Sequence, residues 1–186
     1  NAYTTFRLAN EPDGRNLVCS RFCFADKGGF DELMRLYKSL SSDHRFVKFS
    51  TPANPAMQYF MPEWSLGAVS WSVQSAGMVR AVNAKSVLEK ARYIGSGTVC
   101  VAVQDSQIPE NNDSFAVTFA DGRAESVTRG GEADVVMTVP TFSALIAGVW
   151  DFAEAKAALP GLEVRKKNPC LNQVFFRKPL MIADYF

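Results

Sequence analysis

Two apolar stretches open the chain, Tyr3–Leu8 and Leu17–Phe24. Short apolar runs bounded by turn signals are typical of strands. Between the stretches stands Glu11-Pro12-Asp13-Gly14, where proline presets φ and glycine accepts a conformation that other residues refuse. The pattern therefore predicts a β-hairpin, or two adjacent strands, at the start of the chain.

A helix is predicted after the hairpin, beyond an interruption at Gly28-Gly29. Its apolar residues recur at helical spacing, so their common face should pack on the sheet. Asp31 and Glu32 are expected in its first turn, where negative charge suits the helix dipole. The apolar positions are Phe30, Leu33, Met34, Tyr37 and Leu40, and further elements are predicted at Arg45–Phe49 (strand) and Asn54–Phe60 (helix).

The pattern changes from about residue 65 onward. A β-like stretch, Ser65–Val82, leads into a helical one at Ala84–Arg92. Asp121-Gly122 is a tight turn that predicts a hairpin between the strands on either side of it. The remaining predicted elements are strands at Thr98–Val103, Phe115–Phe119, Arg123–Val127 and Ala133–Val139, helices from Pro140 and over Trp150–Leu159, a short strand up to Arg165, and an apolar tail from Leu171 to Phe186.

These elements predict an α+β fold in two parts. Residues 1–65 should form a helix-on-sheet unit, and residues 66–186 a mostly antiparallel sheet with helices.

Composition excludes several classes of protein. Hydrophobic residues make up 47% of the chain and charged residues 21%, which is typical of a folded domain. The net charge is +1 and no long basic block occurs, so we expect no nucleic-acid partner. No apolar run approaches the ~20 residues of a membrane-spanning helix, and the first residues do not resemble a secretory signal. We therefore expect a cytoplasmic protein with no membrane partner.

The four cysteines fit that environment as reduced residues of the core or its margin. Cys19 and Cys23 are four residues apart in an apolar stretch and are expected to share one face of a strand. A structural zinc site needs a tighter pair and further ligands, so no metal site is predicted. The other two cysteines are Cys100 and Cys170.

Residues that often carry chemistry do not combine into a catalytic group. The only histidine, His44, lies between a predicted helix and strand, as an ordinary surface residue would. Gly95-Ser96-Gly97 precedes a strand, whereas a nucleophile elbow opens a helix, so we interpret it as a loop. Glu132 and Asp134 are expected to point to solvent. The basic cluster Arg165-Lys166-Lys167 is interpreted as a solvated loop, with docking of an anionic group as the alternative.

Aromatic residues crowd the C-terminus at Phe175, Phe176, Tyr185 and Phe186. Core packing explains such a cluster. A second explanation is a chain end that packs inside the protein and brings its carboxylate with it. An α-carboxylate has an ordinary pKa near ~3.5, so it is ionised at neutral pH and can act as a base or a cation ligand.

Several short motifs follow one another along the second half of the chain. Their residues are Met78, Arg80 and Val82; Asp113, Phe115, Val117, Phe119, Asp121, Gly122 and Arg123; Gly131, Ala133, Asp134, Val135, Thr138, Pro140, Phe142, Leu145 and Gly148; and Val174–Phe176 with Leu180–Phe186. In this order the motifs resemble the Eis-type GNAT N-acetyltransferases and the sterol-carrier-protein-like domain that ends them. The resemblance covers nearly the whole chain, with residues 3–65 similar to the later part of a GNAT domain.

The resemblance implies the C-terminal region of an enzyme that transfers an acetyl group from acetyl-CoA to an amine. In that family acetyl-CoA binds a Q/R-x-x-G-x-G/A loop that opens a helix, and no such loop occurs here, so the cofactor should bind outside this chain. The family's tyrosine acid also belongs to the N-terminal domain. The one catalytic role that the resemblance implies for this chain belongs to Phe186, whose terminal carboxylate would act as the base on the substrate amine. The resemblance implies no role for Tyr185.

Three functions follow as hypotheses. The first is a non-autonomous half of an acetyltransferase, whose partners are the N-terminal acetyltransferase domain and the amine substrate. The second is a stand-alone module that binds a lipid or another apolar ligand in a tunnel. The third is a structural part that shapes the substrate cleft and assembles a homo-oligomer, because unpaired strand edges favour association.

Overall fold

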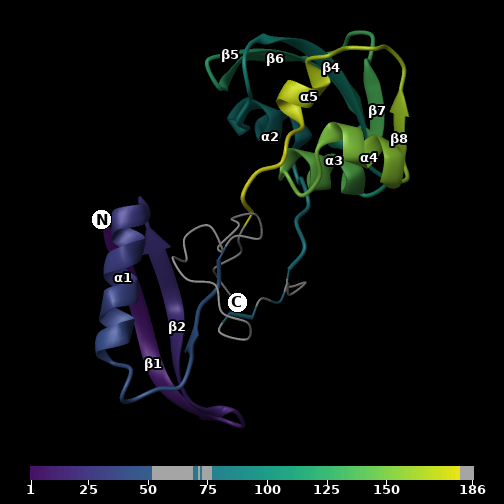
Figure 1. The fold of residues 1–186 in the computed structure, drawn as a ribbon. Coiled ribbons are helices and arrows are strands. Elements are labelled where there is room, and N and C mark those ends of the chain that lie inside the picture. Colours follow the sequence, from purple (N-terminus) through teal and green to yellow (C-terminus); the bar gives the residue numbers. More distant parts are fainter. Residues whose placement is uncertain (52–68, 71, 73–76, 181–186) are drawn as a thin grey trace. The chain divides into compact units, whose positions relative to one another are not determined.

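The computed structural model describes residues 1–51, 69–70, 72 and 77–180, and the chain divides into two compact units, Asn1–Gln74 and Ser75–Phe186. Each unit combines a sheet with helices (Figure 1), so the predicted α+β class is confirmed. The predicted boundary at 65/66 and the predicted helix Asn54–Phe60 lie outside the described residues.

The N-terminal unit begins with the predicted hairpin. β1 (Ala2–Glu11) pairs antiparallel with β2 (Gly14–Phe24) through the two-residue turn Pro12-Asp13. Gly14 has φ +125°, a conformation that explains why glycine closes the turn. A short strand, β3 (Val47–Lys48), lies parallel to β2, and the order of the sheet is β1-β2-β3.

Helix α1 (Lys27–Ser39) packs on this sheet, and it begins earlier than predicted. Asp26 caps it, because its Oδ1 accepts the Gly29 N–H at 2.8 Å. Gly28 and Gly29 therefore lie inside the first turn instead of interrupting the chain. A Cβ at Gly29 would lie 2.9 Å from the Asn1 carbonyl oxygen, so glycine is needed there for close packing. Asp31 consequently lies beyond the first turn and pairs with Lys27 at 2.8 Å.

The prediction that Cys19 and Cys23 share a face is wrong, because β2 contains a bulge. Thr5 pairs with Arg21 and Phe6 with Cys19, which leaves one extra residue on β2. The alternation shifts by one at this point. Cys19 is therefore buried and donates to the Tyr37 hydroxyl at 3.2 Å, whereas Cys23 is exposed. The core of the unit consists of Leu17, Cys19, Phe22, Phe30, Leu33 and Tyr37.

The C-terminal unit contains a five-stranded sheet with the order β6-β5-β4-β7-β8. Only the β4–β7 pair is parallel among its neighbours, so the predicted mostly antiparallel sheet is confirmed. The predicted turn Asp121-Gly122 joins β5 and β6, with φ +50° and +79°. The strands are β4 (Gly97–Gln104), β5 (Asp113–Ala120), β6 (Arg123–Arg129), β7 (Val135–Thr138) and β8 (Leu162–Val164).

The α-helices of this unit cover one face of the sheet (Figure 1). Alternate residues of β4 and β5 point toward them and are fully or almost fully buried, including Val99, Val101, Phe115 and Phe119. The helices are α2 (Ala84–Lys90), α3 (Val139–Ile146), α4 (Phe152–Ala158) and α5 (Leu171–Val174).

The β-like stretch predicted to end at Val82 is not a strand where the structure describes it, at residues 69–70, 72 and 77–82. It pairs with no described strand. Met78 and Val82 are 98% and 68% exposed, whereas Ala81 is buried and donates its N–H to the Ser143 hydroxyl at 2.9 Å. The apolar residues of this segment therefore gave a strand-like pattern in a part of the chain that has no strand partner.

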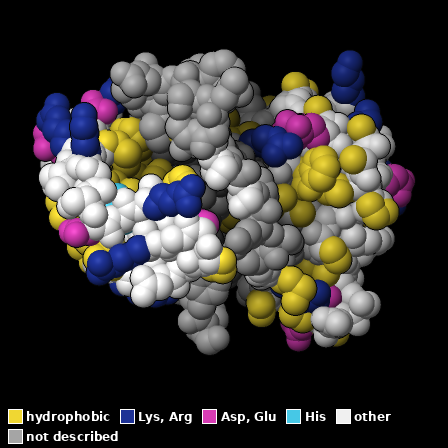
Figure 2. All heavy atoms as spheres, turned by 60° about the horizontal axis from the view of Figure 1, so that its bottom comes forward, with side chains coloured by type: hydrophobic (Ala, Val, Ile, Leu, Met, Phe, Trp, Pro, Cys, Tyr) yellow, Lys and Arg dark blue, Asp and Glu magenta, His cyan; other side chains and the backbone are white. Residues whose placement is uncertain are grey.

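Among the described residues, no helix is long and apolar enough to cross a membrane, and no group of His, Cys, Asp and Glu is arranged to hold a metal ion. Figure 2 shows Lys and Arg side chains in separate groups on one face of the molecule, among acidic, apolar and neutral ones.

Candidate functional site

A buried carboxylate, Asp105, organises the beginning of the C-terminal unit. Its side chain is 0% exposed and forms an ion pair with Arg80 Nη2 at 2.6 Å. It also accepts the Asn111 amide at 3.0 Å and the backbone N–H groups of Gln107 and Ile108 at 2.9 and 3.1 Å. The Asn111 hydrogen bond, followed by those from the backbone, lowers the pKa of Asp105 to about 2. Asp105 therefore stays ionised as a structural anion and is unsuited to act as a general base.

Asn111 extends this network to the start of α2. Its Oδ1 accepts the Ala84 N–H at 2.8 Å and its Nδ2 donates to the Val82 carbonyl at 3.2 Å. The segment 80–84 is thereby fixed, although it belongs to no strand. Sequence reasoning missed both residues; the available signal was a pair of polar residues around Pro109 between two apolar strands.

The hydrogen bonds and the ion pair of Asp105 should make the stability of the folded protein depend on pH in the acid range. Because the folded-state pKa of Asp105 lies below its ordinary value near 4, its stabilisation is present above about pH 4 and is lost as pH falls toward 2. We expect Asp105→Asn to lower the melting temperature at pH 7 and the difference from wild type to shrink between pH 4 and 2. Thermal denaturation at several pH values measures this. Glu125→Gln, on the exposed part of β6, is the matched control and should show no such trend.

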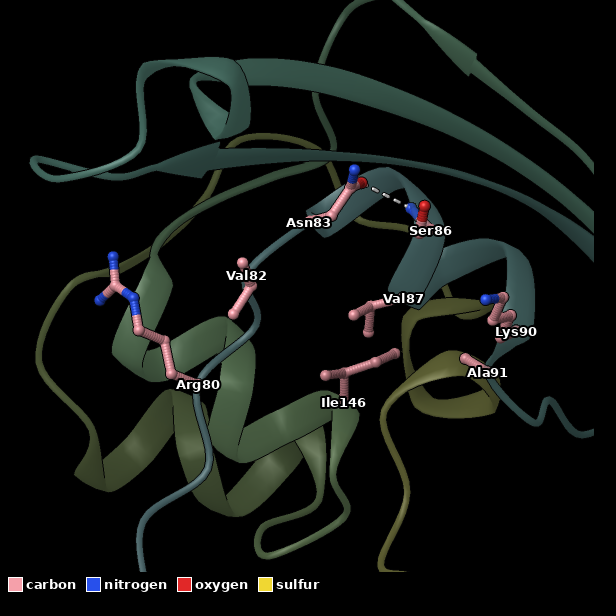
Figure 3. Close-up of a pocket in the computed structure, with 8 residues that line it drawn as sticks. All are labelled: Arg80, Val82, Asn83, Ser86, Val87, Lys90, Ala91 and Ile146. Atoms are coloured by element: carbon pink, nitrogen blue, oxygen red, sulfur yellow. Dashed lines mark hydrogen bonds between the residues drawn. The ribbon is translucent and has the colours of Figure 1, made fainter.

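A pocket lies beside this segment, between α2 and α3 (Figure 3). It is an open depression with a volume of about 510 Å³. Its apolar lining residues come from α2, from α3 and from the segment before α2. Its polar lining residues come from α2 and from that segment. The described lining residues are Val82, Val87, Ala91 and Ile146, with Asn83 and Ser86, and with the cations Arg80 and Lys90.

The predicted base, Phe186, and its neighbour Tyr185 lie outside the described residues. The structure does describe the tail as far as Leu180, and this part is anchored at several points. Phe175 is fully buried and its carbonyl accepts the Phe152 N–H at 3.0 Å. Arg177 forms two hydrogen bonds of 2.9 Å with Glu154, on α4.

Lys178 adds two contacts to the end of α3. Its backbone N–H donates to the Gly148 carbonyl at 3.1 Å, and its Nζ donates to the Ile146 carbonyl at 2.9 Å. Burial lowers the pKa of Lys178 to about 8, because the charged form loses hydration. The backbone from Phe175 to Lys178 is thus tied to α3 and α4 before the chain continues to its end.

The prediction that the acidic pair points to solvent is confirmed for Glu132 and wrong for Asp134. Glu132 is exposed, but Asp134 is buried, and its Oδ2 accepts the Cys100 N–H at 2.8 Å and the Asn168 amide at 2.9 Å. Its carbonyl also accepts the N–H groups of Arg165 and Lys166. A carboxylate that satisfies a backbone donor beside a strand is structural, and only the tertiary fold brings its partners to it.

The other positions considered in the sequence analysis do not form a catalytic or binding group with their described neighbours. Gly95-Ser96-Gly97 is a loop that leads into β4, as predicted. The side chain of Arg165 lies 3.4 Å from Glu163 on the surface. His44 is only half exposed, and its buried Nδ1 has no hydrogen-bond partner, so it is less solvated than predicted.

The first comparison with known proteins concerns the C-terminal unit. A family model described as a sterol carrier protein domain matches residues 84–163, which contain most of the C-terminal sheet. No curated protein matches the chain.

Solved structures extend the likeness to the entire chain. A GCN5-related N-acetyltransferase from Anabaena variabilis superposes with a TM-score of 0.80 at 19% identity, over 100% of this chain and 47% of that one. Eis1 from Mycobacterium abscessus gives 0.77 at 14% identity, over 100% and 48%. A probable N-acyltransferase from Enterococcus faecalis gives 0.76 at 20%, over 100% and 46%. The chain has an acetyltransferase-like fold with a sterol-carrier-type domain, and it spans about half the length of these structures.

Proposed function

We propose that this chain is the C-terminal region of an acetyl-CoA-dependent amine N-acetyltransferase, which shapes the substrate cleft and supplies the terminal carboxylate of Phe186. The observation that carries the proposal is the likeness of the entire chain to about half of three solved structures, one named a GCN5-related N-acetyltransferase, one named Eis1 and one a probable N-acyltransferase. At these identities the likeness concerns the fold, and the activity is our inference from it.

The start of α1 supports placing acetyl-CoA outside this chain. Among the described helices, α1 is the one that opens on consecutive glycines, the kind of sequence that can cradle phosphates. Here the Asp26 carboxylate already accepts the Gly29 N–H, and its negative charge would repel a pyrophosphate. Gly29 is explained by its close approach to Asn1. The acetyl-CoA site therefore belongs to the N-terminal acetyltransferase domain that we propose as partner.

The anchored tail supports a role for the chain end. Hydrogen bonds to α3 and α4 hold Arg177 and Lys178, the last anchored residues that the structure describes before the chain end. A base must be held within reach of the proton that it removes, and this arrangement limits where the carboxylate can go.

The test compares three forms of the complete enzyme in an amine-acetylation assay. Deletion of Phe186 moves the carboxylate by one residue and should lower kcat/KM by about 10²–10⁴-fold, the usual contribution of a general base. Phe186→Ala keeps the carboxylate in place and is the matched control, with a much smaller effect. An unchanged rate after deletion contradicts the role of the carboxylate. Tight acetyl-CoA binding by the 186-residue chain alone, in calorimetry, contradicts the half-enzyme proposal itself.

The sterol-carrier match favours a second candidate, a module that binds an apolar ligand. Such a module needs an enclosed apolar tunnel. In the described part of the chain, the interior between sheet and helices is occupied by packed side chains, among them Phe115, Phe119, Phe142 and Phe175. The depression between α2 and α3 is open to solvent, so we rank this candidate second.

The homo-oligomer stays a prediction. Its physical basis is β1, which lies at the edge of the sheet formed by the described strands. Its ten residues include no proline or lysine, the residues that commonly protect an edge from pairing.

A further inference from the structure

The sheet of the N-terminal unit has one face that packs on α1 and one face that no described helix covers. Four side chains of the β1–β2 pair contact Tyr37 of α1 and define the covered face: Thr4, Phe6, Cys19 and Phe22. Neighbouring residues along a strand point to opposite faces. The uncovered face therefore carries Tyr3, Thr5, Arg7 and Ala9 from β1, and Val18, Ser20, Arg21 and Cys23 from β2.

Two arginines on the uncovered face have no anionic partner. Arg21 lies opposite Thr5, and Arg7 lies opposite Val18, so the two arginines occupy diagonal neighbouring positions on one face. Both are exposed, and neither guanidinium forms a hydrogen bond or an ion pair with any residue that the structure describes. Their positive charges are therefore available to an anion from outside this unit.

The acidic residues of the same unit are largely engaged elsewhere. Four of them form ion pairs and a fifth caps α1: Glu11 and Asp13 with Lys48, Asp31 with Lys27, Glu32 with Arg35, and Asp26 at the cap. Like charges at neighbouring positions of a strand pair repel each other, which costs stability in the folded chain. An arrangement that breaks a local rule in this way is expected where a partner binds, because a bound anion removes the repulsion.

The surroundings of the two arginines are suited to a broad surface. The side chains beside them are small, so the guanidinium groups extend beyond their neighbours: Thr5, Ala9, Val18 and Ser20. The Thr5 and Ser20 hydroxyls lie 2.8 Å apart and offer a further donor next to Arg21. Tyr3, which is 55% exposed, provides apolar contact area at the far end of the face. A protein segment that lies along the strands would contact all of these groups.

The chemistry of the face favours carboxylates on that segment. A guanidinium group binds a carboxylate through two parallel hydrogen bonds, so two arginines match two acidic side chains. A nucleic-acid backbone needs more than two free cations, and it would meet Glu11 at the turn end of the same face. An acidic protein segment is therefore the partner with the best charge complementarity.

We propose that the face of the β1–β2 hairpin opposite α1 docks an acidic protein segment, in which Arg7 and Arg21 each bind one carboxylate of the partner. Thr5, Ser20 and Tyr3 border this contact. The surface lies in the N-terminal unit and goes beyond the proposed acetyl transfer, so docking can be measured without any enzymatic activity.

The experiment is a titration of the 186-residue chain with a capped hexaglutamate peptide, followed by NMR shifts of backbone amides, with hexaglutamine as the control peptide. We expect saturable shifts in β1 and β2 that weaken as salt is added. Arg7→Gln and Arg21→Gln should each weaken binding by up to about fivefold, as for an exposed ion pair, and the double charge reversal Arg7→Glu/Arg21→Glu should abolish it. Lys38→Gln removes the same charge from an exposed position on α1 and should have no effect.

Cys23 offers a second measurement on the wild-type chain. Its thiol is free and exposed, and it lies on the same face as Arg21, two residues away. Bound peptide should slow alkylation of Cys23 by the neutral reagent iodoacetamide in proportion to saturation. Cys170, a half-buried free thiol of the C-terminal unit, should react at an unchanged rate, and mass spectrometry distinguishes the two sites.

Four outcomes would overturn the proposal. Shifts that do not saturate, or that spread over both units, mean that no specific surface exists. An effect of Lys38→Gln as large as that of Arg7→Gln means that only net charge matters. Inorganic phosphate binding as tightly as hexaglutamate assigns the arginines to a small anion, and tighter binding of a single-stranded oligonucleotide assigns the face to nucleic acid. The result of the acetylation assay has no bearing on any of these outcomes.

Discussion

Gly148→Ala should destabilise the C-terminal unit and loosen the tail that follows α5. Gly148 ends α3 with φ +83°, and a Cβ there would lie 2.5 Å from both the backbone nitrogen and the Cβ of Lys178. A side chain at positive φ costs roughly 1–2 kcal/mol by itself. The contact with a backbone atom adds overpacking, typically about 1–3 kcal/mol. We therefore expect a loss of about 2–5 kcal/mol in the free energy of unfolding, measured by urea denaturation.

Gly130→Ala is the matched control for this variant. Gly130 has a similar φ of +93°, but nothing lies within 4 Å of its Cβ position. Gly130→Ala should therefore lower the free energy of unfolding only by the cost of a side chain at positive φ, roughly 1–2 kcal/mol. Gly148→Ala alone should also speed tryptic cleavage after Arg177 and amide exchange at Lys178. Equal losses and unchanged cleavage in both variants would mean that Gly148 does not hold the tail.

In the complete enzyme the same variant connects structure and proposed function. If the tail positions the Phe186 carboxylate, Gly148→Ala should reduce the acetylation rate at temperatures where the protein remains folded. Gly130→Ala should not reduce it.

Phe119→Ala should produce the second large effect. Phe119 is 1% exposed, and its ring stacks on Tyr93 with centroids 4.9 Å apart and planes at 17°. Truncation of a buried phenylalanine typically costs about 3–5 kcal/mol, because apolar contacts are lost and a cavity remains. Tyr93 donates its hydroxyl to the Leu88 carbonyl and so links β5 to α2. The loss of the ring should therefore also weaken the helix that borders the pocket.

Urea denaturation measures the change, and Phe119→Leu serves as its control. Leucine fills much of the cavity, so Phe119→Leu should lose less than half of the stability that Phe119→Ala loses. If the alanine and leucine variants unfolded at the same urea concentration as wild type, the core around β5 would not be the main source of stability in this unit.

Local chemistry made several parts of the fold predictable. Pro12, Asp13 and Gly14 form a turn because of their own backbone preferences, and Asp121-Gly122 closes a hairpin for the same reason. The apolar spacing of α1 and α3 reflects the side of each helix that faces a sheet. Such signals come from residues close together in sequence, so one sequence suffices to find them.

Other features depended on contacts between distant residues. Asp134 resembled a surface charge in sequence, and it became a buried acceptor because β4 brings Cys100 to it and a loop brings Asn168. Asp105 and Arg80 are 25 positions apart and meet only in the folded unit. The bulge that separates the faces of Cys19 and Cys23 follows from strand pairing, which the alternation of one strand does not reveal.

The sequence by itself therefore determined the type and order of most elements, the α+β class, and a resemblance that the fold comparisons support at the level of an acetyltransferase-like structure. Periodicity and turn chemistry are local properties, and they are written into short stretches of chain. The tertiary structure alone decided which polar residues are buried, how the tail is anchored and where the pocket lies. Those features are made by side chains far apart in sequence, whose burial and charge acquire meaning only when the sheet and its helices have assembled.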